Sequence, residues 1–132
     1  NLPGQFSDEF QGAQWVSDTP AVGAVFTGRN KNEFMGEWEV PCTLTHHKAN
    51  EVFAWVPVST ENPAAQWRFD LAPQDGGTRL TFSMILGPGP SGLTAIIEKM
   101  PDKEAAIVHN RQISQAANMA RTVEGIRDLA EK

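Results

Sequence analysis

The feature that most constrains the fold is the C-terminal stretch from Pro101 to Lys132, which contains no further proline. At 1.5 Å per residue it predicts one helix of roughly 28–30 residues, about 42 Å long. Pro101 suits the helix entry and Asp102 is the expected N-cap. A helix of this length must bury one face, so the preceding residues have to supply a surface long enough to receive it.

The residues before this helix alternate with the two-residue period of half-buried strands. The clearest case is the stretch 36–47, where Trp38, Val40 and Cys42 share one face and Glu37 and Glu39 share the other. Further strands are expected over residues 13–17, 24–30, 51–58, 66–73 and 78–86, and a short helix over 93–100. Strands that precede a helix in a separate block are typical of an α+β fold, and the length suits a single domain spanning residues 1–132.

Two local features refine this picture. Pro41 lacks an N–H donor, so we expect it at a sheet edge or a bulge. Asp75, Gly76 and Gly77 suit the positive φ angles of a hairpin turn between the last two predicted strands.

A helical wheel of the C-terminal stretch predicts a broad apolar face turned inward. Its members are Val108, Gln112, Ile113, Ala116, Met119, Ala120, Val123, Ile126 and Ala130. The residues expected on the outward face are Arg111, Gln115, Asn118, Thr122 and Asp128. The middle of the apolar face is rich in alanine, which either permits close packing or leaves room for a ligand. His109 and Gln112 lie within this face or at its margin, so they either bond inside the protein or face a cavity.

Residues 87–92 spell G-x-G-x-x-G, the fingerprint of dinucleotide-binding loops. That function requires free backbone N–H groups and a following strand, whereas Pro88 and Pro90 each remove a donor and only helix follows. The sequence therefore predicts a proline-stiffened connecting loop here.

Few residues offer catalytic or metal-binding chemistry. His46 and His47 are adjacent on a predicted strand and point to opposite faces, with His46 on the inward one. We therefore expect no metal site and no cofactor. Cys42 is the one cysteine of the chain, and it suits a buried strand position. Asn30 shares a face with Phe26, so it either orients a ligand or stabilises a turn.

Composition argues against two classes of partner. The net charge is −5 and the basic residues are scattered, which is unlike a nucleic-acid-binding surface. Apolar residues make up 40% of the chain without forming a run long enough for membrane insertion. A lone cysteine fits a cytoplasmic location.

Several segments together resemble the polyketide cyclase/dehydrase-type branch of the START-like, or SRPBCC, superfamily. The most specific are "PAVGAVFTGRN" and "PQDGGTRLT", with support from "FSDEFQGAQW" and "WEVPCTLTHHKANEVFAWV". The resemblance implies a helix-grip fold, in which a curved antiparallel sheet wraps round the long C-terminal helix and leaves a hydrophobic cavity. It also implies that one more strand and a helix precede Asn1, with "PGQFSDEF" as the second short helix.

The leading functional hypothesis is binding of a small hydrophobic molecule, a lipid, polyketide or aromatic compound, between the sheet and the C-terminal helix. The residues expected to line the site are Asn30, Trp38, Trp55, Trp67, Phe82, His109, Gln112 and Ala116. A first alternative is a cyclase or dehydratase-type enzyme with His109 as acid or base, and a second is a protein-interaction module. Whether there is catalysis stays open, and the chain is expected to be a monomer or homodimer.

Overall fold

The computed structural model describes residues 3–17, 19, 21–33 and 36–131. Predicted features at Asn1 and Lys132 lie outside these residues. In chain order the elements are α1 (Pro3–Phe6), β1 (Phe10–Trp15), β2 (Val25–Asn32), β3 (Gly36–Lys48), β4 (Val52–Pro57), β5 (Ala65–Gln74), β6 (Gly77–Leu86), α2 (Gly92–Lys99), a 3₁₀ turn (Pro101–Lys103) and α3 (Glu104–Ala130). Strands followed by helices confirm the predicted α+β class.

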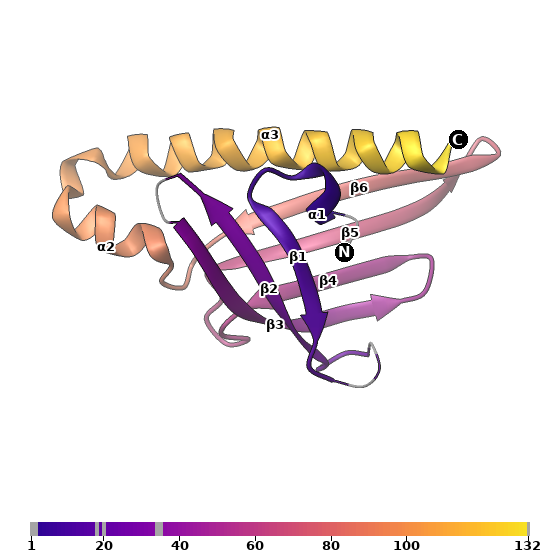
Figure 1. Cartoon of the computed structure of the whole chain (residues 1–132), viewed down its shortest axis with the longest axis horizontal. Helices are drawn as coiled ribbons and strands as arrows, with labels where there is room; N and C mark the ends of the chain where they lie inside the picture. The colour runs from indigo at the N-terminus through magenta and orange to yellow at the C-terminus, as the bar shows by residue number, and fades with distance from the viewer. Residues whose placement is uncertain (1–2, 18, 20, 34–35, 132) are drawn as a thin grey trace.

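The six strands form one antiparallel sheet in the order β1-β2-β3-β4-β5-β6, so each strand pairs with the next along the chain. β1 and β6 are its two edges. Figure 1 shows the sheet as strongly curved, with α3 lying along one side of it, close to β6, and α1 tucked between α3 and the strands. This arrangement confirms the expected helix-grip architecture of a curved sheet against a long C-terminal helix. Within the described residues, every helix is too short or too polar to span a lipid bilayer.

The ends of the helices depend on local side-chain bonds. The Ser7 hydroxyl accepts hydrogen bonds from the backbone N–H groups of Glu9 and Phe10, at 3.2 and 3.1 Å, so α1 ends early and β1 begins before its predicted position. Ser91 and Thr94 form a capping box at the start of α2.

The prediction that Asp102 caps the long helix is wrong. Residues 101–103 form a 3₁₀ turn, and α3 starts at Glu104 with no side-chain hydrogen bond at its N-cap. Instead, the chain enters α3 through this 3₁₀ turn, which begins with Pro101.

β3 carries two irregularities that decide where its side chains point. Pro41 pairs with Thr27 of β2 and lies at the end of the ladder to β4, where the register begins at Cys42. Its carbonyl accepts a hydrogen bond at 2.8 Å from the N–H of Val58, the residue after β4. The register with β4 then shifts between Leu44, which pairs with Trp55, and His46, which pairs with Ala54. This shift reverses the side-chain alternation after Leu44.

The buried core lies at the concave side of β2 and β3. It consists of Ala24, Phe26, Cys42 and Leu44, and partly buried neighbours pack against it: Ala13, Val40, Phe53 and Trp55. Phe26 pairs directly with Cys42, as the two-residue period predicts.

The predicted inward face of α3 is wrong in part. Gln115 and Thr122, expected to face outward, are the buried residues of this helix, with 6% and 1% of their surface exposed. Ile113, expected to face inward, is 55% exposed, and Ala116 and Ala120 are exposed too. A wheel ranks faces by hydropathy alone, whereas α3 is seated through polar contacts to the N-terminal segment.

The contact between α1 and α3 depends on a glycine. A Cβ atom placed on Gly125 would overlap the ring of Phe6. The two helices can approach this closely only because that side chain is absent.

We therefore expect Gly125→Ala to destabilise the protein by about 1–2 kcal/mol, because overpacking outweighs the gain of about 1 kcal/mol in helix propensity. In a Phe6→Ala background the same change should become stabilising, by about 0.5–1 kcal/mol. Urea unfolding followed by tryptophan fluorescence measures both steps of the cycle. A stabilising Gly125→Ala in the unmodified chain would contradict this packing.

Burial also controls the single thiol. Cys42 is 3% exposed, and desolvation raises its pKa from the usual value near 9 to about 12, although a backbone hydrogen bond with Gly28 opposes the change. The folded thiol therefore stays protonated at a pH where the unfolded thiol has begun to ionise.

Iodoacetamide at pH 8 should alkylate folded Cys42 at least ~1000-fold more slowly than the same protein in urea, because the thiolate is the nucleophile. Since the unfolded state loses this proton first, stability should fall as the pH rises from about 9 towards 12. Mass spectrometry of timed samples measures the alkylation rate. Equal rates in buffer and in urea would show that Cys42 is accessible.

Candidate functional site

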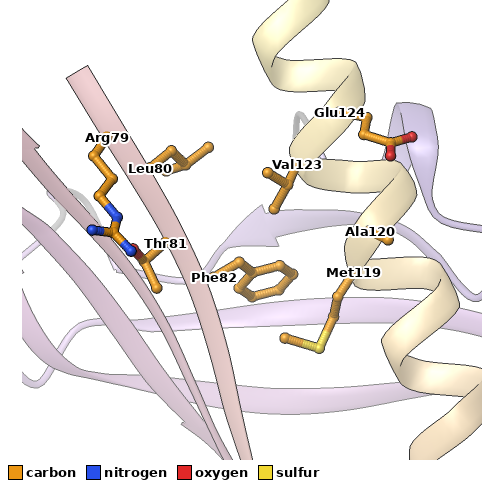
Figure 2. Close-up of a pocket in the computed structure, with 8 residues that line it drawn as sticks. All are labelled: Arg79, Leu80, Thr81, Phe82, Met119, Ala120, Val123 and Glu124. Atoms are coloured by element: carbon orange, nitrogen blue, oxygen red, sulfur yellow. The ribbon is translucent and has the colours of Figure 1, made fainter. Parts of the chain in front are cut away.

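A groove of about 480 Å³ lies between β6 and α3. Its lining residues come from both elements: Arg79, Leu80, Thr81 and Phe82 from the strand, and Met119, Ala120, Val123 and Glu124 from the helix. In Figure 2 the side chains of Leu80 and Phe82 point across the groove towards Met119 and Val123, whereas Arg79 and Thr81 turn to the other side of the strand. The groove is open to solvent.

The periodicity of each element explains this lining. Leu80 and Phe82 are two residues apart on β6, so both face the concave side of the sheet. Met119 and Val123 are four residues apart on α3, so they stack on one stripe of the helix. The helix side of the groove also includes Ala120, which contributes only a methyl group.

The groove continues into an aromatic wall on the concave face of the sheet, formed by Trp55, Trp67, Phe69 and Phe82. Phe82 stacks on Phe69 with ring centroids 4.0 Å apart and planes inclined by 11°. Trp55 and Trp67 stack at 6.2 Å and 9°, and Phe82 lies 5.6 Å from Trp67. These rings sit on adjacent strands because Trp55 pairs with Trp67, and Phe69 with Phe82. All four are only partly buried, so the wall leaves apolar surface exposed.

The opposite side of α3 is attached to the segment between α1 and β1. Arg111 makes a bidentate ion pair with Glu9, in which both side chains are largely buried, at 19% and 14% exposure. The backbone N–H of Asp8 donates to Asn118 Oδ1 at 2.8 Å, and Arg121 pairs with the Asp8 carboxylate at 2.8 Å. These contacts set the rotation of α3 about its own axis, and with it the residues that face the groove.

Gln115 lies on this attached side and differs from its neighbours. Its Oε1 atom is buried and has no hydrogen-bond partner within the described part of the chain. An unsatisfied buried acceptor of this kind costs about 1–3 kcal/mol. Few native side chains are left in this condition, and each calls for an explanation.

The structure brings only some of the residues predicted to line a site to the groove. Phe82 lines the groove, and Trp55 and Trp67 belong to the aromatic wall that it joins. Ala116 lies one turn before Ala120 on α3 and is exposed.

The remaining predicted residues are not brought to the groove. His109 and Gln112 are exposed on α3 and are not among the lining residues. Asn30 and Trp38 pair with each other across β2 and β3 and are half-buried. The structure thus brings together Trp55, Trp67 and Phe82, and leaves Trp38 and the polar residues of the predicted set elsewhere.

The inward placement of His46 is wrong. The register shift after Leu44 turns His46 to the outer face, where it is exposed, and places His47 on the concave face, with its ring 5.9 Å from that of Phe53. Among the described residues, no three His, Cys, Asp or Glu side chains gather in a way that could hold a metal ion.

Sequence reasoning did not single out Leu80, Met119, Val123 or Gln115 as site residues. Leu80, Met119 and Val123 could have been predicted to line a site, because each lies on the apolar face predicted for its own element. The sequence indication for Gln115 is weaker. It belongs to a set of polar residues three or four positions apart, which form a continuous polar stripe on the helix: Arg111, Gln115, Asn118 and Thr122. The charge and hydrogen-bonding groups of this stripe are complementary to the acidic residues Asp8 and Glu9 near the N-terminus.

Neither a protein-family model nor a curated protein matches the sequence. Among solved structures, the chain is similar to the solution NMR structure of a Polyketide_cyc-like protein from Corynebacterium glutamicum, with a TM-score of 0.66 and 23% sequence identity. The match covers 97% of this chain and 76% of that one. At this identity the likeness establishes architecture, and it agrees with the resemblance noted in the sequence: the chain has the helix-grip fold of a polyketide-cyclase-like protein.

Proposed function

We propose that the protein binds a small hydrophobic molecule in the groove between β6 and α3. The observation that carries this proposal is the continuity of the groove with the wall of stacked aromatic rings through Phe82. A volume of about 480 Å³ falls within the usual range for small-molecule sites. The likeness to a polyketide-cyclase-like protein supports the same class of ligand, a polyketide, lipid or aromatic compound.

Apolar burial is the main source of affinity in such a groove. A two-ring aromatic ligand that buries about 200 Å² of apolar surface would gain about 5 kcal/mol. Part of this gain offsets the loss of translational and rotational freedom on association. The expected dissociation constant for a simple aromatic probe therefore lies between micromolar and millimolar.

The placement of His109 gives the enzymatic alternative no support. A general acid or base must reach the reacting group within hydrogen-bond distance, whereas His109 is exposed and outside the groove lining. The lining residues also include Glu124, and Arg79, whose side chain turns to the other side of the strand. Because His109 lies outside the groove, we favour binding over acid–base catalysis by this residue, and the protein-interaction alternative stays a prediction.

Filling the groove tests the proposal. Ala120 is a lining residue, so Ala120→Trp adds an indole to the helix side of the groove, and it should weaken binding of 2-naphthol and of 2-methoxynaphthalene at least tenfold by isothermal titration calorimetry. The volume that the probe needs is then occupied. Helical content should be unchanged, because Ala120 is exposed.

Ala117→Trp is the matched control, since Ala117 is also exposed on α3 but does not line the groove. It makes the same chemical change and should leave both affinities within twofold of the unmodified protein. An equal loss in the two variants, or no loss in Ala120→Trp, would place the binding site elsewhere.

A further inference from the structure

We infer that the free edge of β6 binds an extended segment of a partner protein, which pairs with it as a further antiparallel strand and directs alternate apolar side chains towards the groove. This inference goes beyond the proposed function, because it concerns the backbone edge of β6 as well as the apolar lining of the groove. The kind of partner follows from the hydrogen-bonding pattern, the side chains and the charge along this edge.

The two edges of the sheet differ in how they are protected. β1 has six residues, its register shifts between Phe10 and Gly12, and α1 packs on it, with Gly4 against the backbone of Gln11 and Gly12. β6 has ten residues and pairs with β5 without a register shift. Within the described part of the chain, β6 has no strand on its other side. A long, regular edge of this kind is a template for pairing with another chain.

The backbone groups that face outward from β6 can be identified. The N–H of Gly87 donates to the carbonyl of Ala64 at 2.7 Å, in continuation of the register between β5 and β6. In an antiparallel pair, residues that bond to the partner strand alternate with residues whose backbone groups point away from it. The odd-numbered residues of β6 therefore bond to β5, and the backbone groups of Leu80, Phe82 and Met84 face the free edge.

The same residues direct their side chains to the concave face of the sheet. Leu80 and Phe82 line the groove, and Met84 shares their face because it is two residues further along the strand. Residues directly opposite one another in an antiparallel pair project their side chains to the same face. A strand paired with this edge would therefore place every second side chain beside Leu80 and Phe82, where an apolar side chain fits.

The surface around this edge carries little charge. Residues 80–86 contain no charged side chain, and Arg79 turns to the other side of the strand. On α3, residues 112–120 are also uncharged, although 20% of the chain is charged, and Ile113 is 55% exposed there. This surface is complementary to a segment that is uncharged and apolar on the side that it presents to the groove.

The position of α3 favours a single extended segment over a second copy of the whole chain. α3 runs alongside β6 and bounds the groove on its other side. If β6 paired with β6 of a second copy, the second α3 would also come to lie beside this edge and would compete with the first for the same space. A seven-residue strand brings no helix with it, and at about 3.3 Å per residue it spans about 23 Å, which is shorter than β6.

Peptides that differ only in their backbone test the inference. The probe is acetyl-Lys-Val-Thr-Val-Thr-Val-Lys-amide. When it pairs antiparallel with β6 and its valines face the groove, the valine N–H groups point at β6. N-methylation of two valines removes two of these donors, and we expect it to weaken binding at least tenfold in an NMR titration. N-methylation of the two threonines, whose N–H groups point away from β6, is the matched control and should change the affinity less than threefold.

Amide hydrogen exchange locates the bound peptide on the protein. In the free protein the N–H groups of Thr81 and Ser83, which bond to β5, should exchange slowly, whereas those of Leu80, Phe82 and Met84 should exchange rapidly. Saturation with the unmodified peptide should slow exchange at the latter three at least tenfold and leave the first two unchanged. Binding without this added protection would place the peptide elsewhere and overturn the inference.

The outcomes separate this inference from the proposed function. If 2-naphthol binds but the unmodified peptide does not, or if all three peptides bind equally, the inference alone is wrong. If the peptides bind in the expected order and the outward N–H groups of β6 gain protection, the inference holds even where 2-naphthol fails to bind.

Discussion

The bidentate ion pair between Glu9 and Arg111 is the interaction on which the placement of α3 depends. Both side chains are largely buried, and removing one partner of such a pair leaves the other charge uncompensated at a cost of a few kcal/mol. Together with the contacts of Asp8 to Asn118 and Arg121, it fixes which side of α3 meets the N-terminal segment. Because α3 is one rigid helix, contacts that fix the side facing the N-terminal segment also fix the side that faces the groove.

The sheet supplies the second half of the site by a different kind of contact. Its concave face carries aromatic rings that stack on one another across β4, β5 and β6. Pairs of this kind contribute about 0.5–1.5 kcal/mol each beyond the burial of their area. The rings therefore stabilise one another without contacts from α3. The groove between Phe82 and Met119 remains open.

Prediction from sequence succeeded where one period governs a whole element. Trp38, Cys42 and Phe26 were assigned to the inward face, and β2 and β3 pair in the register that this assignment requires. It failed where a single residue changes the phase. The extra residue between Leu44 and His46 exchanges the faces of His46 and His47. The alternation of "CTLTHH" gives no indication of this register shift. On α3 the wheel failed because Arg111 and Asn118 on the polar stripe bind Glu9 and Asp8, more than a hundred residues away in sequence. These contacts turn the stripe towards the protein, and the alanines are left exposed.

Taken alone, the sequence determined the α+β class, the antiparallel strands and the length of the terminal helix, because periodicity and proline content are local properties of the chain. It also indicated the inward face on which Trp55, Trp67 and Phe82 lie, because strand alternation sets the face of each residue. The tertiary structure alone decided which side of α3 faces the sheet, that His109 is exposed, and that Gln115 Oε1 is buried without a hydrogen-bond partner among the described residues. These outcomes depend on contacts between the two ends of the chain, and the energy of such contacts cannot be read from the spacing of residues within either end.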